Sequence, residues 1–176
     1  MSSRWPTCSW LGDARRDESE SKLDTSIVCG VDGSPDSQAA IGVAARLAER
    51  LGARLVLAHV VEVALVPYAA IGGAGGIAPP PMIPALRDEQ EEAGARLLER
   101  IAVAVGLGDA EQRVAVGLPA ERLADLADDE DAELIVVGSR GRGRFKTAFL
   151  GSVSYSLVGV ARCPVLIVPP GVSATP

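Results

Sequence analysis

The 176-residue sequence predicts an α/β fold in which helices cover both faces of a five-stranded parallel sheet. Short β-branched apolar runs alternate with longer segments whose apolar residues recur at helical spacing. The apolar runs are continuous, which is typical of parallel strands that are buried on both faces. Apolar residues make up 48% of the chain and aromatic residues 3%, so the core of this single domain must consist mainly of Ala, Val, Leu and Ile.

The first elements have clear boundaries. Residues 26–31 are expected to form a buried strand, after which Ser34 supplies an N-cap and Pro35 the first helical position. Apolar residues at helical spacing follow, and Gly52 ends this helix. Residues 54–61 are expected to form the second strand.

The later elements follow the same alternation of strand and helix. Pro119 is expected to begin a short helix. Proline suits this position because it lacks a backbone N–H, and an N–H in the first helical turn would have no partner in the helix. The expected elements are a helix over 85–105, a strand over 113–116, a helix from 119, a strand over 133–137, a helix over 152–160 and a strand over 164–168.

The segment 63–86 is uncharged and long enough to suggest a membrane span. It also contains a high density of proline and glycine, including Pro79, Pro80 and Pro81. Prolines remove amide donors and break helices, so we expect a glycine/proline loop and no membrane contact.

Composition excludes several classes of function. A formal net charge of −6 argues against a nucleic-acid partner and against a polybasic membrane module. The 3 cysteines cannot all pair within one chain, which favours the reducing cytoplasm and a core role for Cys29 and Cys163. The single histidine, His59, excludes a His-rich metal site and is expected to be packed with one hydrogen bond.

The ends of the chain are expected to lie outside the domain. Residues 1–24 have no continuous apolar stretch and are mixed in charge, so we expect a disordered arm and no secretory signal. The predicted domain covers residues 25–170, and residues 171–176 form a tail.

A glycine-rich loop carries the most informative chemistry. Gly138 is followed after two residues by Gly141, and nine residues then precede Gly151 and Ser152. The loop leaves a predicted strand and enters a predicted helix. Glycines let backbone amides approach a phosphate, and a helix start adds unpaired amides and a positive dipole end. Ser152 is expected either to cap this helix or to donate its hydroxyl to a phosphate.

Cationic residues in the same loop contrast with the acidic chain. The cations are Arg140, Arg142, Arg144 and Lys146, and they favour either a small polyanion or a solvated loop. Sequence alone leaves the strand order open. If the order is 3-2-1-4-5, it reverses between strands 1 and 4, and the ligand crevice lies between residues 32–34 and 138–141.

These motifs together resemble the universal stress proteins. The spacing of Gly138, Gly141 and Gly151 matches the ATP-binding signature of that family. The first strand and its acidic turn, residues 27–34, are also similar, as are residues 57–61, 117–120 and 163–168. The resemblance extends over about residues 25 to 169.

The resemblance implies the order 3-2-1-4-5, the Rossmann-like fold of the adenine nucleotide alpha hydrolases, and ATP, with or without Mg²⁺, in the crevice. It also implies a homodimer that pairs the last strands across a two-fold axis. By this resemblance Asp32 lies near the ribose, and Val60, with Gly30 nearby, holds adenine. The phosphates are then held by Gly138, Ser139, Arg140, Gly141, Gly151, Ser152 and Val153.

Several alternatives remain open at this point. Asp32 could instead form an Asx-turn or cap the following helix, and both roles could coexist. The ligand could be cyclic AMP, and the function could be that of a stress-response or signalling protein, a weak ATPase or a ligand-free dimeric interaction module. Efficient hydrolysis is not expected, because the loop offers no acid or histidine near the presumed γ-phosphate.

Overall fold

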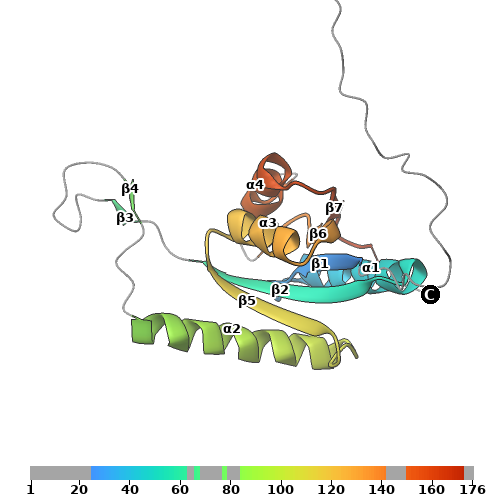
Figure 1. The fold of residues 1–176 in the computed structure, drawn as a ribbon, viewed down its shortest axis with the longest axis horizontal. Coiled ribbons are helices and arrows are strands. Elements are labelled where there is room, and N and C mark those ends of the chain that lie inside the picture. Colours follow the sequence, from blue (N-terminus) through green and yellow to red (C-terminus); the bar gives the residue numbers. More distant parts are fainter. Residues whose placement is uncertain (1–24, 63–65, 68–76, 79–83, 142–149, 173–176) are drawn as a thin grey trace, which may run out of the picture.

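The computed structural model describes residues 25–62, 66–67, 77–78, 84–141 and 150–172. The predicted arm at 1–24 and most of the predicted tail lie outside the described residues. Strands and helices alternate along the chain, except that three strands follow one another after the first helix (Figure 1). The elements are β1 Ser26–Gly30, α1 Pro35–Leu51, β2 Arg54–Glu62, β3 Val66–Pro67, β4 Ile77–Ala78, α2 Pro84–Ala104, β5 Glu111–Gly117, α3 Pro119–Asp129, β6 Ala132–Gly138, α4 Ser152–Val160 and β7 Val165–Val168.

Five strands form the main sheet in the order β5-β2-β1-β6-β7. Every neighbouring pair in this sheet is parallel. Counted along the chain within this sheet, the order is 3-2-1-4-5, so the predicted fold class and strand order are confirmed. The order reverses at β1, which lies between β2 and β6 at the centre of the sheet.

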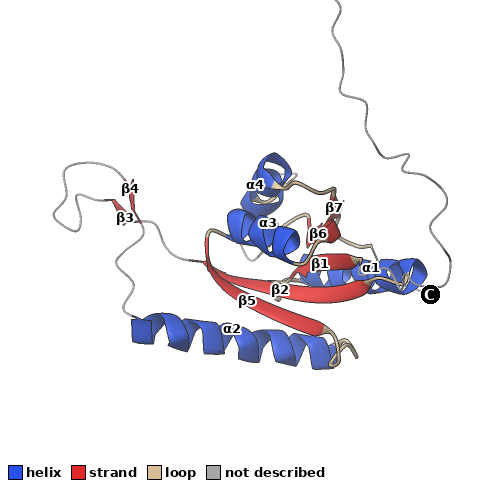
Figure 2. Ribbon diagram, viewed as in Figure 1, coloured by secondary structure: helices blue, strands red, loops and turns tan. Residues whose placement is uncertain are grey.

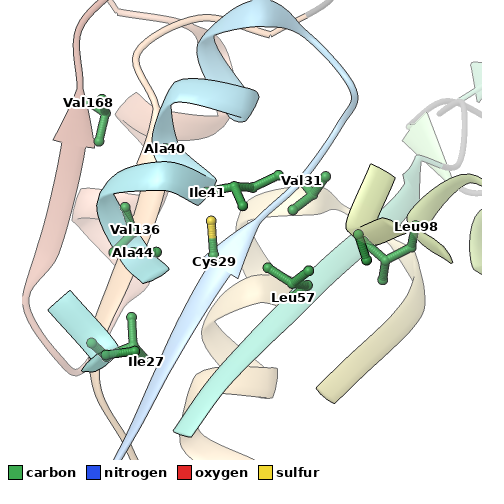
Figure 3. Packing of buried hydrophobic residues seen from close by; sticks show 12 residues of the cluster. Ile27, Cys29, Val31, Ala40, Ile41, Ala44, Leu57, Leu98, Val136 and Val168 are labelled. Carbon is green, nitrogen blue, oxygen red and sulfur yellow. The ribbon is translucent and has the colours of Figure 1, made fainter. Parts of the chain in front are cut away.

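Helices cover both faces of the sheet, as predicted (Figure 2). Helices α1 and α2 pack on one face, where Ile41 and Leu98 point toward Cys29 and Leu57 of the strands (Figure 3). Helices α3 and α4 pack on the other face, where Leu123, Ala127 and Leu157 contact the strands' opposite side chains. Burial of the sheet on both faces explains why its central strands are continuous apolar runs.

The ends of α1 confirm the signals read from the sequence. The Ser34 hydroxyl accepts a hydrogen bond from the amide of Ser37 at 3.1 Å, which satisfies one amide of the first helical turn. Pro35 follows at the first helical position. Gly52 adopts the left-handed conformation with φ of 65°, which suits a residue without a Cβ.

The segment predicted as a glycine/proline loop contains a short antiparallel pairing that the sequence did not predict. Val66 pairs with Ala78, and Pro67 pairs with Ile77. The remainder of 63–83 lies outside the described residues. Among the residues that the structure describes, no helix is both long and apolar enough to cross a bilayer.

The Cys29 thiol is completely buried in the core between β1 and α1. Burial raises the pKa of this thiol to about 12, because a thiolate would lose its hydration there. Cys163 is partly buried, and its pKa is raised for the same reason. Both cysteines are free, as expected for core residues that are not part of a disulfide.

Replacement of Leu57 by alanine tests the core between the sheet and helices α1 and α2. Leu57 is fully buried, so the substitution leaves a cavity and should lower the free energy of unfolding by about 2–5 kcal/mol. Urea denaturation measures this change. Leu51→Ala is the matched control, since Leu51 is 56% exposed and its loss should cost well under 1 kcal/mol. Equal effects of the two substitutions would contradict this description of the core.

Candidate functional site

The site begins where β2 continues beyond the end of β1. The last paired residues of these strands are Gly30 and Ala58, whereas β2 runs on to Glu62 beside β5 alone. The Ala58 carbonyl accepts a hydrogen bond from the Val31 amide at 2.7 Å and therefore points toward β1. Backbone groups two residues apart on a strand point the same way. The amide and carbonyl of Val60 consequently face the space beyond the end of β1.

The turn after β1 is closed by a hydrogen bond to a side chain. The Asp32 carboxylate accepts a hydrogen bond from the Ser34 amide at 2.9 Å, which forms an Asx-turn. Gly33 within this turn has a φ of 78°, a conformation that favours glycine. The predicted alternative for Asp32, an Asx-turn, is therefore confirmed, while Ser34 is the residue that caps α1.

His59 supports this turn from the neighbouring strand. Its Nδ1 lies 2.6 Å from the carbonyl oxygen of Val31. A carbonyl can only accept a hydrogen bond, so Nδ1 carries the proton and donates it. His59 is half-buried and packed, as expected, and it also lines the cavity described below.

Ser139 joins three elements behind the glycine loop. Its amide donates to the Val168 carbonyl of β7 at 2.8 Å, and its carbonyl accepts from the Gly151 amide at 2.7 Å. The Ser154 hydroxyl of α4 also donates to this carbonyl, at 3.1 Å. The Ser139 hydroxyl donates to Asp36 of α1 at 3.1 Å. Ser139 is 5% exposed and is not among the residues that line the cavity.

Close contacts within the protein account for two glycines of the loop. A Cβ at residue 138 would lie 2.7 Å from the backbone carbonyl carbon of Asp36, so the end of β6 packs directly on α1. A Cβ at residue 141 would lie 2.6 Å from Oδ2 of Asp32, so the glycine loop packs against the turn after β1. Packing on the α1 backbone therefore requires glycine at Gly138 whatever the ligand, whereas the close atom at Gly141 is the end of a side chain.

The start of α4 is open to a ligand. Its N-cap is Gly151, and no side chain caps it. The expectation that Ser152 caps the helix is wrong, because Ser152 is already its first helical residue. Amides of a first helical turn have no partner within the helix, and they form the positive end of its dipole. This end of α4 therefore offers donors to an anion.

These segments enclose a cavity of about 570 Å³ at the carboxyl edge of the sheet. Every predicted site residue except Ser139 lines it: Gly30, Asp32, Val60, Gly138, Arg140, Gly141, Gly151, Ser152 and Val153. The charged lining residues among those described are Asp32, Glu62 and Arg140. The Arg140 guanidinium lies 3.3 Å from the Asp36 carboxylate. The other predicted cations, Arg142, Arg144 and Lys146, lie outside the described residues.

Sequence reasoning missed other residues that line the cavity. Leu123 of α3 packs on the sheet and also lines the cavity. Val61 and Glu62 could have been predicted from their position at the carboxyl end of β2, since ligands of such sheets bind beyond the carboxyl ends of strands. The further lining residues are Val31, Ser37, Ala58, His59, Pro119, Val137, Leu150 and Ser154. Within the described part of the chain, no group of His, Cys, Asp and Glu could hold a metal ion.

Comparison with known proteins gives a consistent result. The model of the universal stress protein family matches residues 25–169. Universal stress protein YxiE of Bacillus subtilis is 35% identical over 145 residues, with 81% of this chain and 97% of that protein covered. A universal stress protein of Mycolicibacterium smegmatis is 36% identical over 149 residues, which are 82% of this chain but 45% of that longer protein.

A solved structure agrees in fold. The crystal structure of a universal stress protein in complex with cAMP superposes with a TM-score of 0.55 at 30% identity. The match covers 84% of this chain and 98% of that one.

Substitution of Gly138 by alanine tests the contact between β6 and α1. The added methyl group would lie within 3 Å of three Asp36 atoms, so we expect the free energy of unfolding to fall by about 1–3 kcal/mol. Thermal or urea denaturation measures it. Gly159→Ala in α4 is the control, because nothing lies within 4 Å of its Cβ position and alanine favours helix. A stable Gly138→Ala variant would disprove the close approach of loop and helix.

Proposed function

The chain belongs to the universal stress protein family, and from this premise we propose that it is an ATP-binding member that acts in stress response or signalling. The observation that carries the proposal is the cavity at the reversal of strand order, which unites the acidic turn, the open edge of β2 and the glycine loop. Ligands of open α/β sheets bind in this position.

The open edge of β2 suits an adenine ring. The backbone of Val60 presents one donor and one acceptor side by side, and an adenine edge carries the complementary pair. Gly30 leaves room for two side chains of the cavity lining, since a Cβ there would lie 3.0 Å from Val137 and 3.1 Å from Leu123. Apolar side chains of Leu123 and Val137 then flank the base, as is usual in cofactor sites.

The remaining residues suit the ribose and the phosphates. In the proposal Asp32 accepts a hydrogen bond from the ribose, for which its second carboxylate oxygen is placed on the side of Gly141. The phosphates lie against Gly138, Arg140, Gly141 and the start of α4 with Gly151, Ser152 and Val153. We propose that Ser139 supports the phosphate-binding loop from behind, because its side chain is buried.

ATP is preferred over cyclic AMP as the ligand. The loop and the helix start provide more donors than a single phosphate uses. Cyclic AMP remains the second candidate, because a related protein 30% identical to this chain has been crystallised with it. Mass spectrometry of small molecules released from the purified protein, followed by calorimetry with ATP, with and without Mg²⁺, and with cyclic AMP, tests the proposal. Failure to bind any adenine nucleotide would contradict it.

We propose binding without efficient turnover. The acids that line the described part of the cavity are Asp32, assigned to the ribose, and Glu62, at the end of β2 beyond Val60 and therefore at the adenine end. Rapid phosphoryl transfer needs a positioned water and charge stabilisation at the γ-phosphate. An assay of ATP hydrolysis at high protein concentration tests this part of the proposal.

Replacement of Gly151 by valine should weaken ATP binding by roughly tenfold, or ~1.4 kcal/mol. The backbone angles of Gly151 suit any residue, but a Cβ would lie 3.3 Å from the Ser139 carbonyl and 3.4 Å from the Arg140 Cα. The larger side chain should therefore displace the loop that holds the phosphates.

Calorimetric titration with ATP measures this effect. The matched control is Gly159→Val in the same helix, where the Cβ position has open space. Unchanged affinity of the Gly151→Val variant, or an equal loss in both variants, would defeat the prediction.

The proposal includes a homodimer formed through β7. Within the described residues β7 has a strand neighbour on one side only. The carbonyls of Pro164 and Val168 accept bonds from the β6 side, so the backbone groups of Val165 and Ile167 face the free edge. Helix α4, which contacts β7, also exposes Tyr155 at 75% of its surface.

Replacement of Ile167 by proline should convert the dimer to a monomer. Proline removes the outward amide of Ile167 and leaves the bonds to β6 intact, which is how edge strands tolerate it. Sedimentation velocity measures the change, and circular dichroism confirms that the fold survives. Val103→Lys on α2, at a side chain 65% exposed, is the control and should leave the mass unchanged. A dimer that persists in the proline variant would exclude this interface.

The proposed organisation retains the domain boundaries given by the sequence. The nucleotide-binding domain covers residues 25–170, between an arm at 1–24 and a tail at 171–176. The free thiols of Cys29 and Cys163 accord with the cytoplasm as the compartment, and the net charge of −6 accords with a partner other than nucleic acid.

A further inference from the structure

The glycine loop rests on the first turn of α1 through one carboxylate. Oδ2 of Asp36 accepts hydrogen bonds from the Ser139 hydroxyl at 3.1 Å and from Nε of Arg140 at 3.3 Å. One oxygen atom thus holds the side chains of two consecutive loop residues. Asp36 itself does not line the cavity, whereas Arg140 does.

Asp36 is the fixed member of this pair. Its side chain is 13% exposed, compared with 38% for Arg140. It lies in the first turn of α1, where the helix dipole stabilises a negative charge. A Cβ at Gly138 would lie 2.9 Å from the Asp36 Cβ, so the loop backbone packs directly on this residue.

The bond to Asp36 occupies only one of the three guanidinium nitrogens of Arg140, a residue that lines the cavity. It uses Nε, so the two terminal nitrogens of Arg140 have no partner among the residues that the structure describes. A guanidinium is planar, and anchoring Nε restricts the directions in which the terminal N–H groups point. An arginine held in this way loses less conformational entropy when it binds an anion.

We propose that Asp36 is a positioning residue of the phosphate site: it holds Arg140 by Nε so that the terminal nitrogens meet the nucleotide's phosphates. This inference rests on the proposed nucleotide binding. The negative charge of Asp36 would by itself repel phosphate, but Arg140 neutralises it and the Ser139 hydroxyl solvates it. The positioning of Arg140 by Asp36 is therefore a larger effect than the repulsion between Asp36 and phosphate. Loss of the Asp36 carboxylate weakens phosphate binding.

The test compares adenosine, which lacks phosphate, with ATP. Calorimetry gives the ratio of the two affinities for the unchanged chain, Asp36→Asn, Arg140→Gln and the double variant. We expect Asp36→Asn to lower the ATP-to-adenosine ratio by roughly 5- to 20-fold, the range for loss of a charge-assisted contact. Adenosine affinity should stay constant. The double variant should have the same ratio as Arg140→Gln, because Asp36 acts through Arg140.

The outcomes distinguish failure of the proposed nucleotide binding from failure of the proposed role of Asp36. If the unchanged chain binds neither ATP nor adenosine, the proposed function is wrong and the role of Asp36 falls with it. If the unchanged chain prefers ATP but Asp36→Asn keeps or raises the ratio, the positioning role alone is wrong. A further loss in the double variant beyond Arg140→Gln would likewise overturn it, because Asp36 would then act independently of Arg140.

A measurement on the unchanged chain covers the case in which a variant does not fold. The Nε–H signal of Arg140 is observed by nitrogen-15 NMR, and its exchange with solvent is followed with and without ATP. We expect this proton to remain protected in the ATP complex, because Asp36 keeps its bond while the terminal nitrogens bind phosphate. Rapid exchange that begins only when ATP is added would mean that the ligand breaks the pair, and the proposal would fail.

Discussion

The central constraint is the requirement to bury β1 on both faces of a parallel sheet. The chain leaves β1 for α1 on one face and leaves the neighbouring β6 for α4 on the other. The two exits must therefore diverge, which separates the ends of β1 and β6 from the helices that follow them. The cavity at the carboxyl edge is a direct consequence of this divergence.

Hydrogen bonds at the rim convert this gap into a defined site. The Ser34 hydroxyl lies 3.4 Å from the Arg140 carbonyl, which joins the turn after β1 to the glycine loop. Ser139 ties the same loop to α4 and to β7 through its backbone. A ligand would therefore meet amides whose positions are already fixed by the fold, and preorganised donors bind an anion at a lower entropic cost. The same bonds connect the cavity with the strand through which we propose dimerisation.

The sequence was sufficient to predict the fold because the helix caps, the buried apolar runs and the family resemblance agree with one another. The caps at Ser34 and Gly52 and the buried apolar runs define most elements, and the strand order followed from the family resemblance. The pattern was misleading where polar residues form a strand: β5 begins at Glu111, whereas apolar residues begin only at Val114. Glu111 forms ion pairs with Arg54 and Arg113, which a one-dimensional pattern does not reveal.

The reason why glycine occurs at these loop positions shows why the site itself was harder to predict. Their spacing was interpreted as access for phosphate, yet Gly138 is already required by contact with the Asp36 backbone, and Gly141 lies close to the Asp32 side chain. Such contacts join residues about a hundred positions apart, so a loop motif contains no trace of them. A shared spacing can therefore reflect the packing of two strand exits as much as the ligand between them. Packing determines the position of the glycine loop. The open start of α4 and the Arg140 side chain then remain available to bind an anion.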